Sequence, residues 1–154
     1  MSSFVNVHAT AIRLGGFGIL IRGPARSGKS ALALAALRRA EAAGLTAALV
    51  SDDQVFVEAE GDALLARAPE TIRGLIEVSG VGILRQPTVD GARIELLADL
   101  VPTETIDRLP DQTHVHVCGI MLRRILLPAR EAAFAADVLV TLTQEFCATA
   151  RATR

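Results

Sequence analysis

In the first fifty residues, the apolar positions recur with the spacing of a β-strand in two segments and with the pattern of an α-helix in a third. Residues 5–13 alternate loosely and are rich in β-forming side chains, glycines follow at 15–18, and 19–21 form a short apolar run. This pattern predicts a β-hairpin. Residues 29–43 are rich in Ala and Leu and are followed by Gly44, which predicts an α-helix. Because its first half is apolar all round, we expect the helix to pack against a sheet.

The rest of the chain predicts mostly strands, with one ambiguous segment near the end. A short turn or helix is expected at 69–73. Residues 129–150 favour a long helix, although the β-branched stretch at 138–142 leaves a strand there as the alternative. We find no internal repeat and no linker, so residues 1–154 are expected to form a single domain. The predicted strands are 46–50, 54–58, 64–67, 75–78, 81–84, 93–101, 113–118 and 121–127.

The composition indicates a packed globule and excludes several kinds of partner. The 154 residues are 51% hydrophobic and 21% charged, with a net charge of -1, which argues against disorder. Aromatic residues make up only 3%, and there is no basic run, so no nucleic-acid partner is expected. No apolar run reaches the roughly 20 residues that span a bilayer, and no signal-peptide pattern is present. Cys118 and Cys147 lack the spacing of a metal or redox pair. We therefore expect a cytoplasmic protein without a membrane role.

The clearest motif is the octet G-x-x-x-x-G-K-S, which lies between a predicted strand and a predicted helix, as a P-loop requires. The backbone N–H groups of such a loop surround a phosphate, and the helix N-terminus adds favourable partial charge. We expect Lys29 to reach the β- and γ-phosphates and the Ser30 hydroxyl to bind Mg²⁺. The alternative is a Gly/Ser turn with a surface lysine, which this context disfavours. The predicted nucleotide-binding residues are Gly23, Pro24, Ala25, Arg26, Ser27, Gly28, Lys29 and Ser30.

Acidic residues stand where a phosphoryl-transfer site would need them. Asp52 and Asp53 follow the predicted strand 46–50, and ligands of open α/β sheets bind at the carboxyl ends of strands. One carboxylate could hold Mg²⁺ while the other accepts a hydroxyl proton, although Asp is also common in ordinary turns. Glu77 lies in an apolar segment where an unpaired carboxylate would be costly, so a metal or arginine partner is one explanation. Outward exposure on a half-buried strand is the other.

Three basic side chains remain open from the residues alone. His8, on an alternating strand, is as well explained by a structural role as by a catalytic one. Arg108 and Arg130 could each bind a phosphate through two N–H groups. With 16 Lys and Arg in the chain, however, a surface arginine is expected in any loop, so the residues alone favour a surface role.

Four segments, taken together, resemble the bacterial HPr kinase/phosphorylase family. They are residues 7–10, the motif at 23–30, residues 51–55 and residues 72–83, in matching order and spacing. The resemblance covers residues 4–135, which correspond to the family's catalytic domain, as in the short proteobacterial forms. It implies an α/β fold with a mixed central sheet and flanking helices, of the PEP-carboxykinase-like P-loop kinase type, acting with ATP and Mg²⁺.

The resemblance also implies a substrate and a set of residue roles. Asp53 resembles the family's general base, which deprotonates a serine of the phosphocarrier protein HPr. The same resemblance implies that Asp53 acts as the acid in the reverse phosphorolysis. Long members of the family assemble as hexamers, which implies a homo-oligomer here. By resemblance the catalytic residues are Asp53, His8, Lys29 and Arg108, and the metal-associated residues are Ser30, Asp52 and Glu77. Arg130, in the segment 128–130, loosely matches a loop linked to dephosphorylation.

Several positions depart from the family pattern. The family usually has Ser at Ala25, Glu at Ala31, Arg at Ser79 and Ile-Asp at residues 84–85. The hypothesis is that serine kinase activity toward an HPr-type protein is retained while phosphorolysis is weak or missing.

Two other functions remain as alternatives. A P-loop small-molecule kinase would use Asp53 on a metabolite hydroxyl, but no arginine-rich lid segment follows the first helix. A non-catalytic ATP-binding regulator would use Lys29 without turnover, and loss of Asp53 distinguishes it from a kinase.

Overall fold

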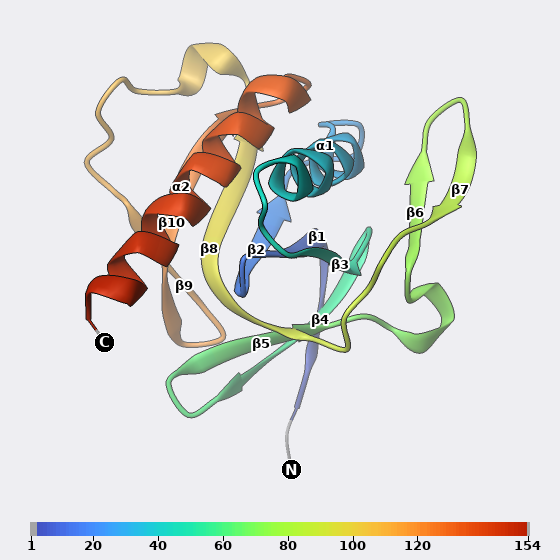
Figure 1. Cartoon of the computed structure of the whole chain (residues 1–154), viewed down its shortest axis with the longest axis horizontal. Coiled ribbons are helices and arrows are strands. Elements are labelled where there is room, and N and C mark those ends of the chain that lie inside the picture. Colours follow the sequence, from blue (N-terminus) through green and yellow to red (C-terminus); the bar gives the residue numbers. More distant parts are fainter. Residues whose placement is uncertain (1–2, 154) are drawn as a thin grey trace.

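The computed structural model describes residues 3–153 and has a mixed α/β fold (Figure 1). Over these residues, an eight-stranded sheet and a two-stranded hairpin accompany two α-helices. The mixed central sheet with flanking helices predicted from the sequence is therefore confirmed. The strands are β1 Val5–Leu14, β2 Phe17–Arg22, β3 Ala47–Ser51, β4 Gln54–Glu60, β5 Ala63–Arg67, β6 Leu75–Val78, β7 Gly82–Arg85, β8 Ala92–Val101, β9 His114–Val117 and β10 Ile120–Pro128. The helices are α1 Lys29–Ala42 and α2 Ala132–Ala152, with 3-10 turns η1 Glu70–Ile72 and η2 Thr103–Thr105.

Two long strands, β1 and β8, each belong to two layers of the fold. Residues 5–8 of β1 pair with β4, whereas residues 9–14 pair with β2, and the end of β1 also pairs with β3. The beginning of β8 pairs with β5, and its remainder pairs in parallel with both β2 and β10. One layer therefore runs β1-β4-β5-β8 and the other runs β3-β1-β2-β8-β10-β9.

Side chains alternate between the two faces of β1 and β8, so these strands contribute to two separate hydrophobic cores. Leu96 and Ala98 of β8 pack with α1 and α2 on one face of the larger layer, whereas Leu97 faces the smaller layer. Burying this apolar surface on both faces is the main favourable term in folding. Figure 1 shows α1 and α2 together on one side and the β4–β5 pair on the other.

The helix predicted near the end of the chain is confirmed, and the alternative strand at 138–142 is wrong. Leu139 and Val140 are buried in the core on one face of α2, which agrees with helical and not with strand periodicity. The helix begins at residue 132 rather than 129, because Arg130 has a left-handed backbone with φ 63. Within residues 3–153, neither helix is both long and apolar enough to cross a membrane.

A partly buried charge cluster holds the end of β2. Arg22 donates from Nε and Nη2 to the two carboxylate oxygens of Asp99 on β8, at 2.8 and 2.9 Å. Arg124 on β10 donates from Nε to Asp99 Oδ2 at 2.6 Å. Burial alone would raise the pKa of Asp99, but the hydrogen bonds from the two arginines outweigh it and lower the pKa. The cluster ties together three neighbouring parallel strands directly before residue 23.

Replacing Asp99 with Asn tests this cluster. We expect D99N to lower the free energy of unfolding by about 2 kcal/mol at neutral pH, because two partly buried arginines lose a charged acceptor. Folding lowers the pKa of Asp99, so this stabilisation is complete above the unfolded value of 3.8 and is lost as the pH falls through the folded value. Urea denaturation at several pH values should show the difference shrinking in acid. Asp62→Asn, in an exposed turn, is the control, and a difference independent of pH would contradict the assignment.

Candidate functional site

The loop at residues 23–30 connects β2 to α1 and is closed by its own lysine. Lys29 is only 7% exposed, and its ammonium donates to the carbonyl oxygens of Gly23 at 2.8 Å and Pro24 at 3.0 Å. The Ser27 amide also donates to the Pro24 carbonyl, at 3.1 Å. Burial lowers the pKa of Lys29, and the nearby charges of Asp53 and Asp52 partly oppose this effect. The lysine is thus held in a compact ring of main-chain groups.

Unpaired donors in this loop fit an anionic ligand. The Ser27 hydroxyl is buried and has no hydrogen-bond partner within residues 3–153. Gly28 caps α1 with φ 95, and no side chain caps the helix, so its first N–H groups are left for a ligand. A Cβ at Gly23 would lie 2.5 Å from Ser27 Oγ, so a side chain there would fill the loop. These features suit phosphate oxygens, which accept several N–H and O–H hydrogen bonds.

Asp52 joins three separate elements through hydrogen bonds to its carboxylate. It is 5% exposed, and its Oδ1 accepts from Ser30 Oγ of α1 at 2.7 Å and from Thr10 Oγ1 of β1 at 2.8 Å. Its Oδ2 accepts from the backbone N–H of Glu77 on β6 at 3.1 Å. The structure thus brings together Ser30 and Asp52, two residues that were predicted to lie near a metal ion. An oxygen pair of this kind is a suitable start for a Mg²⁺ site completed by phosphate oxygens and water.

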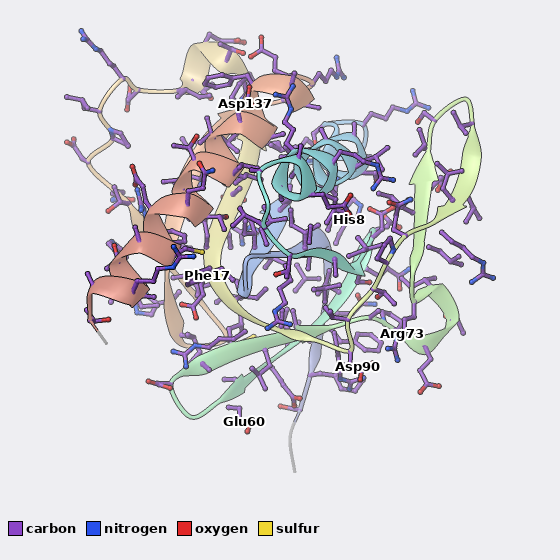
Figure 2. All side chains as sticks on the ribbon, in the orientation of Figure 1. His8, Phe17, Glu60, Arg73, Asp90 and Asp137 are labelled. Carbon is purple, nitrogen blue, oxygen red and sulfur yellow. The ribbon has the colours of Figure 1, made fainter. Side chains whose placement is uncertain are left out.

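Asp53 turns away from Asp52 and pairs with His8. Its Oδ1 lies 2.9 Å from His8 Nε2, and the side chains of His8 and Asp53 are 54% and 64% exposed, respectively. Asp53 has a left-handed backbone with φ 70, a conformation that costs free energy in any residue other than glycine. Neighbouring aspartates thus have different environments, one buried in a network and one facing solvent beside an imidazole. Figure 2 labels His8 close to α1.

The other two predicted residues have weaker connections to the site. Glu77 is exposed on β6, a half-buried strand. The interpretation that its carboxylate is buried and needs a partner is therefore wrong, and the alternative of outward exposure is correct. Its backbone nevertheless lies against Asp52. Arg108 is exposed in the segment between η2 and β9, and over residues 3–153 no hydrogen bond or ion pair connects it to the site. Its catalytic role stays a prediction, as does the role of Glu77 near a metal.

Two further side chains contact the site: Thr10, for which the sequence analysis predicted no role, and Arg130, whose role it left open. Thr10 is fully buried and supports both aspartates, with its Oγ1 3.5 Å from the Asp53 amide. A polar residue at an inward position of an apolar strand was the signal that could have found it. Arg130 is exposed, as the residues alone favoured, and it donates from Nε to the Arg26 carbonyl at 3.1 Å. The sequence contained no signal for this contact, because the contact depends on the left-handed backbone of a residue that precedes α2.

The described part of the chain contains no group of three or more His, Cys, Asp and Glu side chains that could hold a metal ion. Any Mg²⁺ here would need oxygen ligands from a bound nucleotide and water in addition to protein groups, which is common for Mg²⁺. The structure therefore brings together a loop with unpaired donors, a hydroxyl–carboxylate pair and an exposed carboxylate–imidazole pair.

Comparison with known proteins places the chain in a family. The family model described as HPr serine kinase C-terminal domain matches residues 1–153. The chain belongs to this family.

Curated relatives and a solved structure agree with this assignment. HPr kinase/phosphorylase of Geobacillus thermodenitrificans is 35% identical over 136 residues, which cover 80% of this chain and 42% of the relative. The protein of the same name from Alkaliphilus metalliredigens is 31% identical over 140 residues, covering 83% and 43%. The chain thus spans less than half the length of these relatives. The Hpr(Ser) kinase/phosphatase from Coxiella burnetii has a similar fold, with a TM-score of 0.76 at 24% identity over 96% of this chain and 99% of that one.

Replacing Thr10 with Val tests the support of Asp52 without changing side-chain shape. We expect T10V to fold and to lower the free energy of unfolding by about 1–2 kcal/mol, because a buried carboxylate loses one donor. Thr143→Val is the matched control: Thr143 is also fully buried, but its hydroxyl donates only to the Leu139 carbonyl within α2. Urea denaturation of both variants measures the difference. Equal losses would mean that the bond to Asp52 has no special weight.

Proposed function

We propose that this protein is an ATP-dependent serine kinase that acts on an HPr-type phosphocarrier protein of the phosphotransferase system. Family membership supports the substrate, and the site supports the chemistry. The observation that carries the proposal is the pairing of Asp53 with His8 next to the Asp52–Ser30 pair at the start of α1. A proton acceptor and a cation-binding pair are then adjacent to a loop with unpaired phosphate-binding donors.

Each group has a distinct task in this mechanism. Bound ATP with Mg²⁺ supplies the γ-phosphoryl group, which is transferred to the serine oxygen, and ADP leaves. Lys29 and the amides of the 23–30 loop hold the phosphates. Ser30 and Asp52 would hold Mg²⁺ through their oxygens, and the cation would neutralise charge on the phosphates. Asp53 accepts the proton that the serine hydroxyl loses as its oxygen bonds to phosphorus, and His8 orients the Asp53 carboxylate through its 2.9 Å contact.

The finer features of the protein are part of the same proposal. We assign the chain to the PEP-carboxykinase-like P-loop type, with a single catalytic domain over residues 1–154 that works as a homo-oligomer in the cytoplasm. Reverse phosphorolysis is weak, because Ala25, Ala31 and Ser79 differ from the family pattern. Arg108 and Glu77 act as a catalytic arginine and a magnesium-associated acid, a proposal that rests on resemblance.

Two other functions stay as outcomes of the tests. A small-molecule kinase would transfer phosphate to a metabolite and leave HPr unmodified. A non-catalytic regulator would bind ATP without any transfer.

The central test is incubation of the purified protein with MgATP and HPr. We expect phosphoserine on HPr, detected by mass spectrometry. In Asp53→Asn we expect the transfer rate to fall on the order of 10²–10⁴-fold, because the proton acceptor is lost. Affinity for MgATP, measured by calorimetry, should change little. Asp111→Asn, in an exposed loop, is the matched control. Absence of phosphoserine with the wild-type protein would remove the kinase proposal.

Lys29 provides a second test, directed at phosphate binding. We expect Lys29→Ala to reduce the transfer rate on the order of 10²-fold or more, because a preorganised positive charge is removed from the phosphates. The substitution also removes the two hydrogen bonds that close the loop, so circular dichroism and thermal unfolding should accompany the assay. Unchanged turnover in a folded variant would exclude this role for the lysine.

A further inference from the structure

The connection between β10 and α2 packs against the outer side of the 23–30 loop. The backbone N–H of Arg130 donates to the Ser27 carbonyl at 2.9 Å, and its Nε donates to the Arg26 carbonyl at 3.1 Å. The preceding amide, that of Ala129, donates to the Val101 carbonyl at the end of β8, also at 2.9 Å. A single residue more than a hundred positions away in the chain thus holds two consecutive carbonyl groups of the loop, and its own segment is fixed to the sheet.

These two carbonyl contacts determine where the neighbouring amides point. In a trans peptide the C=O and the following N–H point in opposite directions, and no cis peptide occurs within residues 3–153. The Arg26 carbonyl faces Arg130, so the Ser27 N–H must face the inside of the loop. It does, since it donates to the Pro24 carbonyl at 3.1 Å. By the same geometry, the Ser27 carbonyl on Arg130 turns the Gly28 N–H inward, where a phosphate would accept it.

The backbone at this contact is strained on both sides. Arg130 has φ 63 and Arg26 has φ 65, a region that costs non-glycine residues about 1–2 kcal/mol each. A Cβ on Gly28 would lie 3.5 Å from the N and Cα atoms of Arg130, so the two backbones approach closely. Such strain persists only where surrounding bonds enforce it, which here are the bonds from Ala129 and Arg130.

We propose that Arg130 is a positioning residue whose side chain, through the Arg26 carbonyl, holds the Ser27 end of the 23–30 loop in the conformation that binds phosphate. This inference rests on the proposed binding of nucleotide by the 23–30 loop. Arg130 acts through two carbonyl groups and from outside the loop. Its loss should therefore weaken nucleotide binding equally in the ground state and the transition state, which raises KM for ATP and leaves kcat nearly unchanged.

Arg130→Gly is the informative variant. Glycine adopts φ 63 without strain and keeps the backbone N–H, so only the Nε hydrogen bond and the side chain are removed. We expect the Kd for MgADP, measured by calorimetry, and the KM for ATP to rise about 5- to 10-fold, as for one lost hydrogen bond. The KM for HPr and kcat should stay within about twofold of the wild type. Arg130→Lys should not restore affinity, because the bond to the Arg26 carbonyl comes from Nε and a lysine has no donor at that position.

Arg151→Ala is the matched control, since Arg151 lies exposed in the last turn of α2, the helix that follows Arg130. It should leave Kd and both KM values unchanged. An Arg130→Gly variant that binds MgADP as tightly as the wild type overturns the inference. A lowered melting temperature with an unchanged KM for ATP also overturns the inference, because it would show that Arg130 only stabilises the fold.

One measurement separates this inference from the proposed function. In nucleotide-free protein labelled with ¹⁵N, Arg130→Gly should shift the amide resonances of Ser27 and Gly28 and leave those of α1 beyond its first turn in place. Unchanged Ser27 and Gly28 resonances overturn the positioning role whether or not nucleotide binds. Failure of the wild-type protein to bind MgADP would instead remove the proposed nucleotide function, while the resonance shifts would still support the hold on the loop.

Discussion

A single buried carboxylate, that of Asp52, is the constraint on which the arrangement of the site depends. A carboxylate that is 5% exposed must find hydrogen-bond donors, and Asp52 takes them from Thr10 of β1, Ser30 of α1 and the Glu77 amide of β6. Ile12, Leu32 and Ile76 of the same three elements are buried in one apolar core, so packing and the carboxylate act together at this point. The need to satisfy one charge therefore fixes the first turn of α1 relative to β1, and keeps the β6–β7 hairpin beside them.

The layered sheet supplies the rigidity that this network requires. Strands β2, β8 and β10 lie parallel, and the Asp99 cluster ties their ends together just before the loop. Arg73 of the β5–β6 connection pairs with Asp90 before β8, and Figure 2 shows the two side chains near one another beside the hairpin. The loop, the hairpin and the two aspartates are thus anchored to different strands of one sheet. A site assembled from rigid strand ends can keep its polar groups in place without a ligand.

Most of the fold could be read from the chain, because hydrophobic periodicity reports burial directly. The hairpin before residue 23, the helix after it and the strands around Gly61 and Gly80 follow from such patterns. The motif at 23–30 likewise predicted a loop with unpaired donors. Three features could not be predicted: the division of β1 and β8 between two layers, the Arg22–Asp99–Arg124 cluster, and the contact of Arg130. Each depends on pairing between distant segments, and neither period nor local propensity carries that information. The sequence also left the environment of Glu77 open, and the fold resolves it as exposed.

The shared strand β1 has a wider consequence. His8 lies in the half that pairs with β4, and Thr10, two residues further along, lies in the half that pairs with β2. The imidazole and the hydroxyl therefore reach the two aspartates from one short stretch of strand. Because side chains alternate between the two faces of a strand, a single residue inserted between positions 8 and 10 would turn one of these two side chains away from the aspartates.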